Sequence, residues 1–188
     1  MTNGVNQAPL LPTEVFATFV GLIDQSALQR IFVGLTLAMT NKVQRVHLLF
    51  QTTGGTVGDG VCLYNYLRSL PIEISLYNVG TVASIGALAY LGAKVRKTST
   101  SGTFMLHRTQ AGAQGITAER LQAVGKSISL DDQRTEAILR ERLNLPDEMW
   151  EVHRVADLWL SAEEALRCGL ATEIADFAPL LGSPVFNI

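Results

Sequence analysis

The sequence predicts an α/β fold with a mainly parallel sheet. Three strand–helix units follow one another between Val15 and Leu91, and the connections within them are short. Their strands are apolar throughout, which is typical of a sheet covered on both faces. In folds of this kind, functional groups gather at the carboxyl ends of the strands, where loops lead into helices.

The first two units are defined by apolar runs, a cap and a glycine turn. The turn at Gly54-Gly55 separates the second strand from its helix, and Pro71 ends that helix. The predicted elements are a strand over 15–23, a helix from Asp24 or Ser26 to Met39, a strand over 46–50 and a helix over 57–70.

The third unit places a serine between a strand over 73–78 and a helix over 85–91. That helix has no charged residue, so we expect it to be buried. The hydroxyl of Ser84 would lie in the first turn of this helix, near unpaired amides and the positive end of the helix dipole, which suits a nucleophile. The alternative is that Ser84 only caps the helix.

The second half of the chain predicts short strands around a long helix. A helix over 117–143 would be about 40 Å long, more than this domain needs to cover itself, so we expect it to contact another subunit. A capping box at Ser161–Glu164 opens the last helix. We predict three parts: a loose segment over 1–13, one domain over 14–175 with a protruding helix–strand handle over 111–145, and an irregular tail over 176–188.

Composition narrows the class of protein. The chain has 188 residues, 47% of them hydrophobic and 17% charged, which fits one domain with some apolar surface buried between subunits. The net charge of −2 indicates neither nucleic acid nor a membrane as partner, and no apolar run approaches the ~20 residues of a membrane span.

The N-terminus lacks a signal-peptide pattern. Cys62 and Cys168 suggest buried thiols in a reducing compartment, so we expect a cytoplasmic protein.

A serine nucleophile needs a base and an orienting acid. His107 directly follows the predicted strand over 103–106 and is the leading base, whereas His47 lies inside an apolar strand and His153 in a charged helix, where we expect it to be solvated. Asp157 precedes an apolar run and is the leading acid; alternatively it caps a helix or pairs with Arg154. Other late aspartates lie in polar helices or turns: Asp131, Asp132 and Asp147.

Two backbone amides could form an oxyanion hole, those of Gly55 and of Ile85, the residue after the serine. The alternative is that Gly54-Gly55 is simply a tight turn. No set of His, Cys, Asp or Glu residues has metal-ligand spacing, and no phosphate-binding glycine motif is present. We therefore predict no metal and no cofactor.

Six motifs follow one another along the chain: Gly54–Val57, Gly80–Ala87, Phe104–His107, Gly112–Gly115, Asp157–Ala165 and Gly169-Leu170. In this order they resemble the proteolytic subunit of the Clp protease (ClpP), a family of the crotonase-type superfamily. The resemblance covers 15–174 and implies a Ser84, His107 and Asp157 triad with Gly55 and Ile85 as oxyanion donors. It also implies substrate-binding residues at Gly54 and in a peptide-binding strand: Gly112, Ala113, Gln114 and Gly115.

The resemblance further implies a serine peptidase that degrades peptides or unfolded protein inside stacked heptameric rings, with 117–143 as the helix of the ring-to-ring handle. Three features depart from the family pattern. The segment before Val15 is short, which counts against a Clp-type ATPase partner; Arg108-Thr109 replaces the usual Gln-Pro; and Arg154-Val155-Ala156 replaces a charged approach to Asp157.

Two other functions remain open from the sequence. The departures from the family pattern allow a catalytically weak or regulatory assembly subunit. The wider superfamily also contains acyl-CoA hydratases and isomerases, which place glycine oxyanion donors at two strand–helix turns but do not use a Ser–His–Asp set.

Overall fold

A computed structural model describes residues 13–112, 114–115 and 117–188. Most of the segment expected to be loose, residues 1–12, and one expected substrate-binding residue, Ala113, lie outside this range.

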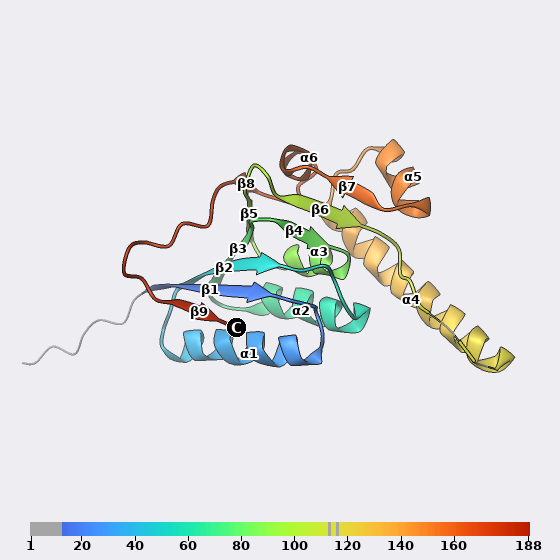
Figure 1. Cartoon of the computed structure of the whole chain (residues 1–188), viewed down its shortest axis with the longest axis horizontal. Helices are drawn as coiled ribbons and strands as arrows, with labels where there is room; N and C mark the ends of the chain where they lie inside the picture. The colour runs from blue at the N-terminus through green and yellow to red at the C-terminus, as the bar shows by residue number, and fades with distance from the viewer. Residues whose placement is uncertain (1–12, 113, 116) are drawn as a thin grey trace, which may run out of the picture.

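The centre of the molecule is a six-stranded sheet whose paired strands all run parallel (Figure 1). The apolar strands expected from the sequence form its middle, and the strand order is β8-β5-β3-β2-β1-β9. The bounds are β1 (Glu14–Val20), β2 (Arg45–Gln51), β3 (Glu73–Asn78), β5 (Val95–Thr98), β8 (Glu173–Ile174) and β9 (Val185–Asn187). The predicted α/β class with a mainly parallel sheet is confirmed.

A smaller sheet carries the candidate site. Its strands are β4 (Thr81–Ala83), β6 (Thr103–Leu106) and β7 (Leu158–Leu160), in the order β4-β6-β7. β4 pairs with β6 in parallel, and β6 pairs with β7 antiparallel. A bridge between Thr52 and Val82 connects this sheet to the end of β2. The loops after β2, β4 and β6 therefore meet in one region.

Helices pack around the two sheets. α1 (Gln25–Thr40) and α2 (Val57–Ser69) lie along one face of the large sheet, and α4 (Ala118–Arg142) extends away from the body (Figure 1). Only Asp132 and Leu139 of α4 are buried, so most of this helix faces outward, as its length led us to expect. The remaining helices are α3 (Ile85–Tyr90), α5 (Asp147–Val155) and α6 (Ala162–Arg167).

The C-terminal tail differs from our expectation. Residues 175–184 form no helix or strand, but the last residues form β9, so the predicted irregular tail is wrong at its end. β9 covers the edge of β1, whose backbone groups would otherwise lack partners. The Ile188 amide donates to Thr18 O at 3.0 Å, and the Ile188 side chain lies over Gly34 of α1.

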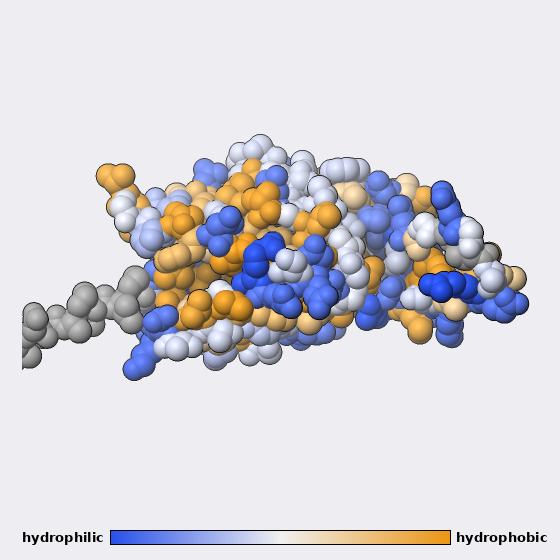
Figure 2. All heavy atoms as spheres, turned by 60° about the horizontal axis from the view of Figure 1, so that its bottom comes forward, coloured by the Kyte–Doolittle hydropathy of each residue, from blue (hydrophilic) through white to orange (hydrophobic). Residues whose placement is uncertain are grey.

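The exposed face of α1 is partly apolar. Figure 2 turns this side of the molecule forward and shows apolar and charged side chains intermixed on it. A mostly apolar cavity of about 660 Å³ lies between α1, β1 and β9. Cys62 is exposed, against our expectation, because it falls outside the buried stripe of α2, whereas Cys168 is buried.

Candidate active site

Ser84 sits on a strained turn between β4 and α3. Its φ and ψ are 58° and −135°, and Lys42 is the only other non-glycine residue with positive φ in the described part of the chain. The Ser84 amide donates to Met105 O at 2.7 Å, which ties the turn to β6. Its side chain makes no capping hydrogen bond, so the interpretation of Ser84 as a simple helix cap is wrong. Strain of this kind costs about 1–3 kcal/mol and is concentrated at functional sites.

Glycines allow the neighbouring backbone to approach this turn. Gly54 has a φ of 108°, and a Cβ there would lie 2.6 Å from Ser84 Cβ and 2.9 Å from Ser84 Oγ. A Cβ at Gly60 of α2 would lie 2.1 Å from Ile85 Cγ1. Close packing on these two sides therefore fixes where the serine hydroxyl lies.

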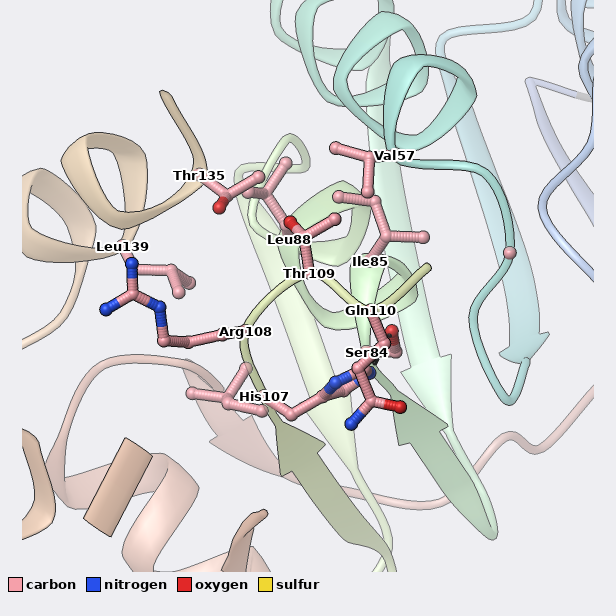
Figure 3. Close-up of a pocket in the computed structure, with 12 residues that line it drawn as sticks. Val57, Ser84, Ile85, Leu88, His107, Arg108, Thr109, Gln110, Thr135 and Leu139 are labelled. Atoms are coloured by element: carbon pink, nitrogen blue, oxygen red, sulfur yellow. Dashed lines mark hydrogen bonds between the residues drawn. The ribbon is translucent and has the colours of Figure 1, made fainter. Parts of the chain in front are cut away.

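His107 meets Ser84 directly. Nε2 of His107 lies 2.7 Å from Ser84 Oγ, and the two side chains lie together in Figure 3. The pairing of β4 with β6 explains this contact, because Ala83 and Met105 are register partners and the two residues follow at the same end of these strands. Nδ1 of His107 is buried and has no hydrogen-bond partner among the described residues.

Asp157 stands near His107 in the strand pairing but forms no hydrogen bond with it. β6 and β7 pair antiparallel with Leu106 opposite Leu158, so His107 and Asp157 stand one step beyond the last paired residues. The side chain of Asp157 is exposed, and the unpartnered Nδ1 shows that it does not accept a hydrogen bond from His107 there. The structure thus brings two of the three predicted catalytic residues together.

Asp132 is a buried carboxylate beside the loop that follows His107, and the sequence did not single it out. Its Oδ1 accepts from the Thr109 amide at 2.8 Å, and its Oδ2 accepts from Arg108 Nε at 2.9 Å. Burial alone would raise the pKa of Asp132, but these hydrogen bonds and the Arg108 charge outweigh it and hold the pKa below its ordinary value. The sequence feature that could have indicated Asp132 is Arg108, directly after His107, since a charged side chain beside a buried site needs a partner of opposite charge.

His153 is buried rather than solvated, so that expectation is wrong. It lies on the inner face of α5 against Trp150, with ring centroids 5.8 Å apart, and its Nε2 has no hydrogen-bond partner among the described residues. Burial lowers the pKa of His153, and the negative charge of Glu136 opposes this shift only in part. His47, by contrast, lies on the sheet as expected, with Nδ1 2.9 Å from the Tyr77 hydroxyl.

The predicted oxyanion donors border the same cavity as Ser84. Ile85 is the first residue of α3, where amides have no intrahelical acceptor. Gly55 forms a bridge with Ile23, and a Cβ at Gly55 would lie 2.1 Å from Ile23 O, so this loop position requires glycine.

A cavity of about 80 Å³ opens beside the serine (Figure 3). Its aliphatic lining comes from α2, α3, β6 and α4. The aliphatic residues are Val57, Ile85, Leu88, Leu106 and Leu139, and Thr135 also lines the cavity. The predicted substrate-binding residues Gly112, Gln114 and Gly115 are exposed and form no strand in the described part of the loop. Across the described ranges, no three His, Cys, Asp or Glu side chains are grouped as a metal site.

Comparison with known proteins identifies the family. Residues 11–177 match the family model for the Clp protease. The chain belongs to the Clp protease family. Clp proteolytic subunits are serine peptidases, and their fold belongs to the crotonase-type superfamily, in agreement with the mixed α/β architecture.

Two relatives illustrate how far the Clp likeness extends. The chain is 31% identical over 137 residues to the ATP-dependent Clp protease proteolytic subunit 1 of Gloeobacter violaceus, covering 72% of this chain and 69% of the relative. It is 28% identical over 163 residues to proteolytic subunit 2 of Pseudomonas aeruginosa, covering 86% of this chain and 80% of the relative.

A solved structure shows the same fold. A point mutant of ClpP1 from Listeria monocytogenes superimposes with a TM-score of 0.74 at 20% identity, covering 88% of this chain and 92% of that one. Clp family members assemble into oligomeric rings that enclose a proteolytic chamber. Among the described residues, no helix is both long and apolar enough to cross a membrane.

Proposed function

We propose that this Clp-family chain is a serine endopeptidase that uses Ser84 as nucleophile and His107 as base. The observation that carries the proposal is the 2.7 Å contact between Ser84 Oγ and His107 Nε2 at a strained strand–helix turn. Such a contact lets the imidazole accept the serine proton as the hydroxyl attacks a peptide carbonyl.

The reaction follows from the atoms in place. Ser84 Oγ bonds to the carbonyl carbon while His107 Nε2 takes the hydroxyl proton. The amides of Gly55 and Ile85 then donate to the oxyanion, and each such donor lowers the barrier by about 3 kcal/mol. The imidazolium returns its proton to the leaving amine, and a water molecule, activated by the same imidazole, hydrolyses the acyl-enzyme.

Asp157 completes the proposed triad by accepting a hydrogen bond from Nδ1–H of His107, which orients the ring and stabilises the imidazolium. The antiparallel pairing of β6 with β7 supports this role, because His107 and Asp157 each stand one residue beyond the last pair, Leu106 and Leu158. The exposed Asp157 side chain must turn toward the imidazole for this bond to form.

The proposed substrate is an extended peptide or unfolded protein. The cavity beside Ser84 fits an apolar side chain of the substrate, because aliphatic groups form a large part of its lining. Residues Gly54 and Gly112–Gly115 are proposed to bind the peptide backbone.

We further propose that residues 14–175 form the peptidase domain and that copies of the chain assemble into stacked rings. The resemblance to the Clp family favours rings of seven copies. The outward-facing α4 supports such contacts. We also propose that the protein acts in the cytoplasm and that a Clp-type ATPase is its candidate partner.

A catalytically weak or regulatory assembly subunit is the second candidate. One observation favours it: Nδ1 of His107 is buried without a partner among the described residues while Asp157 is exposed. An acyl-CoA hydratase gains no support from the contact between Ser84 and His107, since that chemistry does not use a serine–imidazole pair.

Covalent labelling distinguishes these functions. A fluorophosphonate probe should label the native assembly at Ser84, and Ser84→Ala should remain unlabelled. A weak or regulatory subunit would be labelled slowly or not at all and would not cleave small fluorogenic peptides. Stabilisation by acyl-CoA without labelling would support the hydratase. Native mass measured on the same sample reports the size of the assembly.

A further inference from the structure

The loop after His107 is fastened to α4 by a charged pair that we call the Arg108–Asp132 clasp. Asp132 Oδ2 accepts from Arg108 Nε at 2.9 Å and lies 2.8 Å from Arg108 Nη2, while Oδ1 accepts from the Thr109 amide at 2.8 Å. Both carboxylate oxygens of Asp132 are thus used by the two residues that follow His107. The two arginine nitrogens on one oxygen and the amide on the other leave little freedom for the loop to turn.

Burial makes the clasp energetically significant. The Asp132 side chain is 11% exposed and the Arg108 side chain 40% exposed. A buried carboxylate that loses its partners carries a large desolvation cost, whereas a fully exposed ion pair of the same length contributes little. The lowered pKa of Asp132 keeps it ionised at neutral pH, so the charge is present under working conditions.

The helix that holds the clasp also forms part of the substrate cavity. Asp132, Thr135 and Leu139 recur at helical spacing on α4, and the last two line the cavity together with Arg108 and Thr109. Figure 3 shows the loop of Arg108 and Thr109 between this helix and Ser84. A displacement of α4 would therefore move the residues after His107 and the cavity wall together.

The imidazole needs this support because no described residue orients its far side. Nε2 of His107 contacts Ser84, but Nδ1 has no partner among the described residues. The backbone before His107 is held by β6, and the backbone after it is held by the clasp. His107 is thus fixed mainly through the two segments that flank it.

We propose that Asp132 is a positioning residue that holds His107 on Ser84 through Arg108 and Thr109, and thereby couples the placement of α4 to catalysis. This inference rests on the peptidase function proposed above. Most of α4 faces outward. If another copy of the chain displaced this helix, Arg108 and Thr109 would transmit the displacement to His107 through their hydrogen bonds to Asp132.

The test compares Asp132→Asn and Arg108→Gln with the control Asp131→Asn in the native assembly. Asp131 is the neighbouring residue of α4 and pairs with Arg134 instead of the loop. We expect both clasp variants to lose about 10–100-fold in kcat with little change in KM, because misplacement by about 1 Å costs on the order of 100-fold. The fluorophosphonate labelling rate should fall in parallel, and Arg108→Lys should recover part of it. The control should retain the rate of the unchanged protein.

A readout that does not need activity separates the two proposals. Amide hydrogen exchange at Thr109 and the imidazole ¹⁵N signals of His107 should change in Asp132→Asn and remain unchanged in Asp131→Asn. If the unchanged protein is not labelled, the proposed peptidase function is wrong. The Thr109 exchange and His107 ¹⁵N signals then still test whether Asp132 holds the loop. If the protein is labelled and Asp132→Asn and Arg108→Gln both keep its rate and its Thr109 exchange, the clasp proposal is overturned. If Asp132→Asn does not assemble, Arg108→Gln still tests the proposal, because Arg108 is more exposed than Asp132 and its replacement disturbs the fold less.

Discussion

Gly54→Ala should inactivate the site without replacing a reacting side chain. The new Cβ would lie 2.6 Å from Ser84 Cβ and 2.9 Å from Ser84 Oγ, whereas ordinary contacts begin near 3.4 Å. Ser84 must therefore shift by roughly 0.8 Å, a displacement that costs on the order of 100-fold in rate. Alanine is also strained at a φ of 108°. Strain and overpacking together should lower the free energy of unfolding by about 2–5 kcal/mol.

The assay measures the fluorophosphonate labelling rate and kcat on a fluorogenic peptide, in samples of equal native mass. Gly58→Ala is the matched control, because it lies four residues away in α2 and its added Cβ meets nothing closer than Arg134 Nη2 at 3.9 Å. We expect the control to keep its activity and to gain a few tenths of a kcal/mol of stability from the better helix former. A Gly54→Ala protein that labels within about threefold of the unchanged rate would refute the reasoning.

Three further predictions follow from named contacts. Asp157→Asn should lower kcat by up to about 10⁴-fold if Asp157 orients His107 in the active assembly; unchanged kcat would exclude that role. Because burial lowers the pKa of His153 below 6.5, the folded chain binds fewer protons than the unfolded one. The free energy of unfolding should then fall below about pH 6.5 by up to about 1.4 kcal/mol per pH unit, and less in His153→Gln; equal slopes in denaturant titrations would contradict this. Tyr90→Phe removes a hydroxyl that donates to Lys97 O at 2.5 Å and should cost about 1 kcal/mol in the same titrations.

The parallel sheet and part of the site were predictable, because short local sequence patterns indicate them. Apolar strands bounded by glycine and proline define the parallel sheet, and a glycine turn or strand end marks each of Gly55, Ser84 and His107. Parallel strands then bring these positions to one edge without any knowledge of side-chain packing. The contact between Ser84 and His107 follows from the pairing of β4 with β6.

The features that we missed depend on contacts between distant segments. Asp132 and His153 lie in polar helices, and nothing in those helices shows which short stretch is covered by the loop after His107 or by the body of the protein. β9 was missed for the same reason, since a strand of three residues becomes stable only when the edge of β1 is available to pair with it.

The two carboxylates beside His107 differ in what they can still do. Asp132 already accepts hydrogen bonds at both oxygens, from Thr109 and from Arg108, so turning it toward the imidazole would cost those bonds and strand a buried charge. Asp157 is exposed and, like His107, stands one residue beyond the pairing of β6 with β7, so bringing it inward costs part of its hydration. A hydrogen bond from the buried Nδ1 of His107 would offset that cost. Asp132 is therefore suited to hold the loop in place, and the proposed triad role of Asp157 requires only that its exposed side chain turn inward.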